Sequence, residues 1–204
     1  LIRDFTKNPA QIKLQNSNRS RQLIDQFLYE VKKQSDKPKT LLSIIEKCKF
    51  SQFLIFTRTK FGAEKLGYRL KSADLKVEII HGNKVQKQRA RSLLKFKSKR
   101  VDILVATDVA ARGLDIDKLP CVVNYDIPEQ PDDYTHRIGR TGRAGEKGVA
   151  LSIANAKEGK LVKNIEKHLG LKIKKANRDF PVPVSEKPQK KKKVRQKEQH
   201  KADR

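Results

Sequence analysis

Hydrophobic positions along the chain fall into short runs that are separated by longer segments with helical spacing. The runs are four or five residues long, apolar and often β-branched, which is typical of buried strands. The predicted strands cover residues 27–31, 53–56, 77–80, 103–106, 121–125 and 149–153. The segments between them repeat apolar residues every three or four positions. The predicted helices cover residues 39–48, 61–71, 86–96 and 156–169.

This alternation predicts the fold class. Strands that are separated by helices of about 10 to 15 residues indicate an α/β fold, with a mostly parallel central sheet flanked by helices. The apolar positions also predict which side of each helix is buried. For the helix over residues 86–96, that side carries Ala90, Leu93 and Leu94.

Composition adds a class of partner to this picture. The chain has 48 Lys and Arg residues against 23 Asp and Glu, a formal net charge of +25. Such a balance favours polyanions such as nucleic acids and makes binding dependent on salt. No apolar run approaches the ~20 residues that span a bilayer, so no membrane contact is expected. Cys48 and Cys121 lack metal-ligand spacing, so they are predicted to be buried free thiols of a cytosolic protein, and no metal site is predicted.

An arginine-rich segment over residues 134–145 carries the strongest chemical signal. Arg137, Arg140 and Arg143 recur every three residues, which predicts that they lie on one side of a helical turn. The intervening glycines leave the backbone bare, so a large anion can approach closely. Guanidinium groups stay charged and bind phosphate oxygens bidentately, which suits the stabilisation of a phosphoryl group in transfer. A solvated basic face or a general nucleic-acid patch is the alternative for this segment alone.

A second segment, residues 101–116, lies upstream. Its predicted strand ends in Thr107 and Asp108, at the carboxyl edge where ligands bind in open α/β sheets. Gly113 permits a sharp turn that presents Asp115. A plain strand-to-helix loop with an Asx cap is the alternative. The arginine segment downstream favours a binding site.

Four segments, taken in order, resemble the motifs of the C-terminal RecA-like lobe of DEAD-box RNA helicases, and the match is close to the bacterial RhlE-type subgroup. They are motif IV, the block with the Q-x-x-R element, motif V and motif VI, at residues 53–60, 81–89, 106–115 and 136–143. The resemblance covers roughly residues 20–170 and implies a three-layer RecA-like domain. It also implies a cytoplasmic, ATP-dependent RNA helicase that uses ATP with Mg²⁺ and needs an N-terminal RecA-like lobe.

The chain has neither a G-x-x-x-x-G-K-[ST] phosphate loop nor an Asp-Glu-Ala-Asp block. We therefore expect an ATP site only at the cleft with the N-terminal lobe, which would hold most of the ATP and Mg²⁺. Alone, the chain is expected to be inactive as an ATPase.

The resemblance assigns roles residue by residue. Arg140 and Arg143 would face the γ-phosphate as arginine fingers, and His136 would couple this motif to the acidic box of the partner lobe. Asp115 would accept a hydrogen bond from the ATP ribose. Arg112 would brace the RNA-binding elements against motif V. The residues expected to contact RNA phosphates and sugars are Thr59, Gly82, Gln86, Arg89 and Thr107.

The resemblance also divides the chain into three parts. Residues 1–20 are expected to be the end of the preceding lobe and the interdomain linker, and residues 21–170 the helicase C-terminal domain. Residues 171–204 form a Lys-rich tail that is predicted to be disordered, and its last part, residues 187–204, carries a net charge of +7. The lysine run at 190–193 permits a nuclear-localisation signal, but we favour nonspecific RNA tethering because the resemblance is bacterial.

Two other functions stay open at this point. A noncatalytic RNA-binding or regulatory module would fit a chain with no partner lobe. A DNA-translocating relative is less favoured, because His136 and Arg137 open the arginine motif where many DNA helicases carry Gln. Factors of ribosome assembly and of RNA decay are both possible partners.

Overall fold

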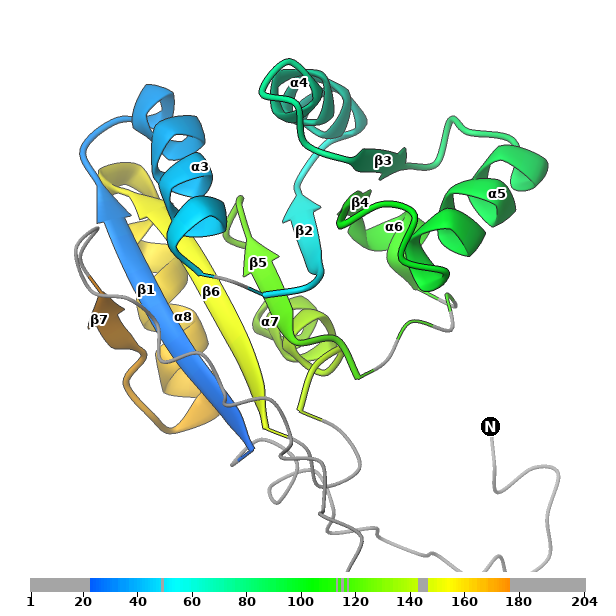
Figure 1. The fold of residues 1–204 in the computed structure, drawn as a ribbon. Coiled ribbons are helices and arrows are strands. Elements are labelled where there is room, and N and C mark those ends of the chain that lie inside the picture. The colour runs from blue at the N-terminus through cyan, green and yellow to red at the C-terminus, as the bar shows by residue number, and fades with distance from the viewer. Residues whose placement is uncertain are drawn as a thin grey trace, which may run out of the picture.

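The computed structural model describes residues 23–48, 50–112, 114, 116, 118–142 and 147–176 (Figure 1). The described strands form one sheet in the order β3-β4-β2-β5-β6-β1-β7, and all of its pairings are parallel. The strands are β1 (Ile24–Val31), β2 (Phe53–Thr57), β3 (Val77–Ile80), β4 (Ile103–Thr107), β5 (Cys121–Asn124), β6 (Gly148–Asn155) and β7 (Lys174–Ala176). The six predicted strands are all present, so the predicted parallel α/β sheet is confirmed.

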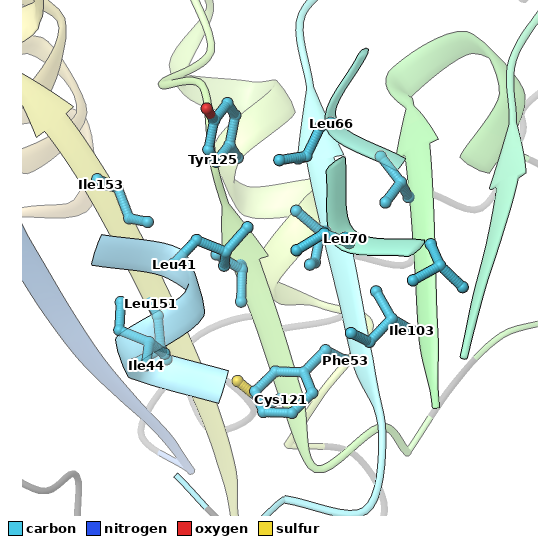
Figure 2. Packing of buried hydrophobic residues seen from close by; sticks show 14 of the residues in the cluster. Leu41, Ile44, Phe53, Leu66, Leu70, Ile103, Cys121, Tyr125, Leu151 and Ile153 are labelled. Carbon is cyan, nitrogen blue, oxygen red and sulfur yellow. The ribbon is translucent and has the colours of Figure 1, made fainter. Parts of the chain in front are cut away.

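Helices cover both faces of the sheet because its central strands are apolar on both sides. Phe53 and Ile55 of β2 belong to one hydrophobic cluster, whereas Leu54 and Phe56 belong to a second one behind the sheet. In Figure 2, side chains of the first cluster from α3 and α4 pack over the strands. The helices are α3 (Lys37–Lys47), α4 (Lys60–Lys71), α5 (Gln86–Lys97), α6 (Asp108–Ala111), α7 (Pro131–Ile138) and α8 (Gly159–Leu169), with short 3-10 turns η1 (Gln34–Asp36) and η2 (Ala156–Glu158).

The three layers follow from this distribution. α3 and α4 contribute to the cluster on the first face, and α5, α6, α7 and α8 contribute to the clusters on the second. Figure 1 shows α3 in front of the sheet, with α7 and α8 behind it. The predicted three-layer fold is therefore confirmed.

The predicted buried side of α5 holds only for Leu93, which is partly buried against the second cluster. Ala90 and Leu94 are exposed, and the helix instead buries Ser92 and Phe96. Two contacts accompany this orientation: Ser92 donates a hydrogen bond of 2.7 Å to a carboxylate oxygen of Glu78 on β3, and Phe96 packs in the second cluster. With Ser92 and Phe96 against the sheet, Ala90 and Leu94 lie on the solvent side of the helix.

The sheet also gains a strand that the sequence did not predict. β7 pairs in parallel with β1 and lies in residues 171–204, which the sequence assigns to the basic tail. Its three residues contain two lysines and no apolar run, so their pattern carried no strand signal. The described fold thus extends to Ala176, and residues 177–204 lie outside the described part of the chain.

The buried surroundings of the two cysteines match the expectation of free thiols. Cys48 and Cys121 are both buried, and neither forms a disulfide. Burial raises the pKa of the Cys121 thiol well above its usual value, which keeps it protonated and unreactive. Within the described ranges, no helix is long and apolar enough to cross a membrane. The same residues contain no group of three or more His, Cys, Asp or Glu that could hold a metal ion.

The start of β6 tolerates no side chain. A Cβ on Gly148 would lie 2.0 Å from the hydroxyl of Thr141 and 2.3 Å from the backbone nitrogen of Gly142. We predict that Gly148→Ala destabilises the chain by about 1–3 kcal/mol, because the backbone must shift to relieve this overlap. Urea unfolding should show a lower midpoint at an unchanged slope. Gly159→Ala is the control, since a Cβ there meets no atom within 4 Å. Equal stability of the two variants would contradict the prediction.

Candidate functional site

Predicted RNA-contacting residues gather at the carboxyl edge of the sheet. Thr59 follows β2 by two residues, Gly82 follows β3 by two residues, and Thr107 is the last residue of β4. These strands are neighbours in the order β3-β4-β2, and Thr57 and Thr107 are paired in register. Because the strands are parallel, their ends meet at one edge, where ligands of open α/β sheets bind.

Two of these residues have a local reason for their position. Thr59 is the N-cap of α4, and its hydroxyl accepts a hydrogen bond of 3.0 Å from the backbone N–H of Gly62. Gly82 is exposed, and a Cβ on it would meet no atom within 4 Å. The fold of the described chain therefore leaves the space beside Gly82 open.

The Q-x-x-R element links α5 to α6. Gln86 is the first residue of α5, and its side-chain oxygen accepts a hydrogen bond of 3.2 Å from Arg89. A second guanidinium nitrogen of Arg89 donates to the carbonyl oxygen of Ala110 at 3.1 Å. Its Nε is buried and has no hydrogen-bond partner among the described residues. Arg89 thus couples the start of α5 to the short helix that follows β4.

Three of the predicted site residues with different roles, Arg112, His136 and Arg140, converge on the face of the sheet that α6 and α7 cover. A small hollow there is lined by Arg112, His136 and Arg140, together with the carboxylates of Asp108 and Asp133. His136 is exposed on α7, and Arg140 is half-buried just after this helix. Arg140 donates a hydrogen bond of 3.2 Å to the carbonyl oxygen of Leu114, which ties motif VI to motif V.

Arg112 sits at the rim of this hollow. Its side chain is 58 % exposed, and its guanidinium group forms an ion pair with Asp133, in the first turn of α7. The pair joins the end of α6 to the start of α7. Arg112 therefore braces motif V against the helix that carries motif VI, on the same side of the molecule as His136 and Arg140.

The predicted stripe of three arginines on one side of a helical turn is wrong for Arg137. α7 ends at Ile138, and Arg137 is only 2 % exposed, so it points into the protein. Its guanidinium group donates two hydrogen bonds of 2.7 Å to the carboxylate of Asp108. It also donates to Asn124 and to the carbonyl oxygen of Asp126, and it stacks over Phe56.

Arg137 is the functional residue whose role the sequence misjudged. Its spacing matches Arg140, and the sequence alone does not reveal which arginine is buried. One signal was available, because Asp108 at the end of a buried strand needs a cation to hold its charge. Arg143, Asp115 and Gly113 lie outside the described residues, so their predicted roles stay predictions.

Comparison with known proteins identifies the family. The model of the helicase conserved C-terminal domain matches residues 36–145, more than half of the chain, and this range holds all four motif segments. The chain belongs to this family. A curated relative, the ATP-dependent RNA helicase DeaD of Buchnera aphidicola, is 40% identical over 177 residues, which are 87% of this chain and 29% of that protein. The helicase lobe thus spans less than a third of the relative.

Solved structures place the lobe among DEAD-box proteins. The Escherichia coli DEAD-box protein SrmB, solved with the regulator of ribonuclease activity A, is 32% identical, with a TM-score of 0.69 over 75% of this chain and 90% of that one. Saccharomyces cerevisiae Dbp5, solved with RNA and ADP BeF3, is 33% identical, with a TM-score of 0.78 over 87% of this chain and 48% of that one. The chain has the C-terminal lobe of a DEAD-box helicase, and the predicted RecA-like fold is confirmed.

We predict that Arg137→Ala destabilises the helicase lobe by about 3–5 kcal/mol, because it leaves the carboxylate of Asp108 without its cation in a largely buried site. Arg112→Ala is the matched control. Its exposed ion pair with Asp133 should contribute at most about 1 kcal/mol. Urea unfolding of both variants measures the difference. Similar losses in the two variants would show that the buried pair is not the stronger tie.

Proposed function

We propose that the chain is the C-terminal lobe of an ATP-dependent RNA helicase, and that its ATP site is completed at the cleft with an N-terminal RecA-like lobe. One observation carries this proposal. Arg112, His136 and Arg140 line the same hollow, and the buried pair of Arg137 with Asp108 holds motifs V and VI against each other beneath it. Cationic groups in fixed positions are what a phosphoryl-transfer site requires.

The described residues fit the phosphate end of ATP in charge and in hydrogen-bonding type. Arginine offers five donors in a rigid fork, and Gly139 beside Arg140 adds no side chain to the surface. In this proposal Arg140 and Arg143 are arginine fingers, and His136 contacts the acidic box of the other lobe. Asp115 binds the ribose. ATP with Mg²⁺, held mainly by the N-terminal lobe, supplies the transferable phosphoryl group.

The carboxyl edge of the sheet supplies the RNA side. Thr59, Gly82 and Gln86 offer exposed hydroxyl, backbone and amide groups near neighbouring strand ends, and Arg89 adds positive charge. Thr107 completes the edge but is buried, with 7 % of its surface exposed. Such groups position a phosphate–sugar backbone without reading its bases, so binding is nonspecific in sequence. Contacts with 2′-hydroxyls would favour RNA over DNA.

α6 connects the two sides of this site. Its first residue, Asp108, binds Arg137, while the carbonyl oxygen of Ala110 accepts a hydrogen bond from Arg89. ATP and RNA thus contact surfaces that share one short helix. If both ligands bind better to the closed arrangement of two lobes, each favours the binding of the other. Closure brings Arg140 and Arg143 to the phosphates and strains the RNA, so that a short duplex separates.

Finer assignments are part of the proposal. The bacterial RhlE-type subgroup and a cytoplasmic location stay predictions, because the matched relatives range from bacterial DeaD to yeast Dbp5. A protein partner stays open too. SrmB was solved with a regulator of ribonuclease activity, which keeps RNA decay beside ribosome assembly as a possible context.

We predict that Arg140→Ala in the full-length protein lowers RNA-stimulated ATP hydrolysis by about 10³-fold or more, because the transition state loses a cation. The phosphate release rate at saturating RNA measures the effect, and Arg100→Ala, an exposed arginine in the turn after α5, is the control. Wild-type turnover in Arg140→Ala would overturn the arginine-finger role. The present chain alone should hydrolyse no ATP. If the full-length protein also hydrolysed no ATP, a noncatalytic RNA-binding module would be favoured.

We predict that Gly82→Ala weakens binding of single-stranded RNA about tenfold, which is the loss of roughly one charge-assisted hydrogen bond. The reason is that a methyl group there would hold the RNA backbone away from the protein backbone. The lobe itself has room for it, so stability should not change. Fluorescence anisotropy with labelled oligouridine measures the affinity, with Gly159→Ala as the control. Unchanged affinity would argue against RNA contact at this edge.

A further inference from the structure

The outer side of α4 displays two large aromatic residues to solvent. Phe61 is 76 % exposed and Tyr68 is 63 % exposed, among the most exposed large apolar side chains that the structure describes. They are seven residues apart, nearly two helical turns, so they lie on the same side of the helix about 10 Å apart. The opposite side of α4 buries Ala63, Leu66 and Leu70 in the core. Packing of the helix is thus complete without the two aromatic rings.

The charge around these rings is positive. Lys60, Lys65, Arg69 and Lys71 are exposed on the same helix. Lys60 lies 5.4 Å from the ring centre of Phe61, and Lys71 lies 5.8 Å from that of Tyr68. The outer side of α4 therefore combines flat apolar rings with cationic groups that can reach a neighbouring anion.

The single acidic residue of α4 does not offset this charge, because it is engaged elsewhere. Glu64 accepts a hydrogen bond of 2.7 Å from His81 and forms an ion pair of 3.3 Å with Lys84. Partial burial works to raise the pKa of Glu64, but the hydrogen bonds with His81 and Lys84 outweigh it and hold the pKa below its usual value. Glu64 is therefore ionised and neutralised by the loop before α5.

These contacts also join α4 to the carboxyl edge of the sheet. His81 and Lys84 flank Gly82, and Lys60 donates a hydrogen bond of 3.3 Å to Asn83 in the same loop. Thr59, the N-cap of α4, precedes Lys60 directly. Phe61 therefore lies close to the RNA-contacting positions proposed at Thr59 and Gly82, and Tyr68 lies farther from them along the helix.

We propose that the outer side of α4, formed by Phe61, Lys65 and Tyr68 and flanked by Lys60 and Lys71, is an auxiliary binding surface for single-stranded RNA. It rests on the proposed function and extends the RNA path beyond the sheet edge. Bases stack on the two rings, while the lysines attract the phosphates. Each stacked base contributes about 1–3 kcal/mol in other single-strand binding proteins, without regard to its identity.

The composition of this surface favours RNA over a protein partner. Aromatic residues are common in protein interfaces, but lysine is depleted from them because it is costly to desolvate. Here each ring has a lysine beside it, on a chain with a formal net charge of +25. Aromatic rings interleaved with cations are instead typical of platforms for single-stranded nucleic acid.

The test compares RNA binding by the full-length protein and its Phe61→Ala/Tyr68→Ala variant. Both side chains are exposed, so the urea midpoint should stay unchanged. We expect affinity for an oligouridine of about 20 nucleotides to fall about tenfold or more, while one of about 6 nucleotides loses little, because it fills only the sheet edge. Phe61→Tyr/Tyr68→Phe should retain the affinity, since it keeps both rings. Leu171→Ala, an exposed apolar residue elsewhere, is the control.

Two outcomes would overturn the auxiliary surface. In one, the alanine variant binds the long RNA as tightly as the wild type, which would favour a protein partner for the two rings. The other is an equal loss with the short RNA, which would assign the rings to the primary path. Gly82→Ala separates the two proposals. If Gly82→Ala loses affinity for RNA and the aromatic variant does not, the auxiliary surface is wrong while the proposed helicase function stands. As a second readout, 4-thiouridine in the long RNA should crosslink to a peptide that contains residues 61–68, and its absence counts against the surface.

Discussion

The buried ion pair between Arg137 and Asp108 is the contact on which the rest of the site depends. Taking a guanidinium group out of water costs several kcal/mol unless charge and hydrogen bonds replace the lost hydration. Arg137 obtains both, from the carboxylate of Asp108, the amide of Asn124 and the carbonyl oxygen of Asp126. These partners lie at the end of β5 or within two residues after β4 or β5. One side chain thus fixes α7 against the sheet and sets where the following residues emerge.

The parallel sheet converts this local tie into a functional surface. Because all described pairings are parallel, the residues after β2, β3 and β4 reach the same edge although they are distant in sequence. Hydrogen bonds then connect that edge to the hollow lined by Arg112, His136 and Arg140: Arg89 donates to Ala110, and Arg140 donates to Leu114. A shift of α6 would therefore be felt at both surfaces, which is the physical requirement for coupled binding of two ligands.

The sequence predicted the fold well where hydrophobic burial alone decides the structure. The buried strands appeared as apolar runs, whereas the motif positions came from the resemblance to the helicase family. It failed where polar contacts decide. On α5, a hydrogen bond to Glu78 accompanies the burial of the polar Ser92. β7 forms by backbone pairing of a lysine-rich segment with β1. Arg137 is buried against hydrogen-bond partners that lie 11 to 29 residues away in sequence. No local pattern contains those partners, whereas the spacing of Arg137 and Arg140 suggested equal roles.

In the proposed function, a lobe built this way would bring its cations to the cleft already positioned. An arginine that had to order itself during the reaction would lose part of its effect to reorganisation, whereas one that is held beforehand stabilises developing charge directly. Arg140 is held by Leu114 and by the turn that Arg137 anchors, so the ordering cost is met when the lobe folds. In that proposal, ATP and RNA would then have only to select the closed arrangement of the two lobes. An ATP site that is divided between two lobes would then hydrolyse no ATP until both ligands bind, because neither lobe alone would surround the phosphates.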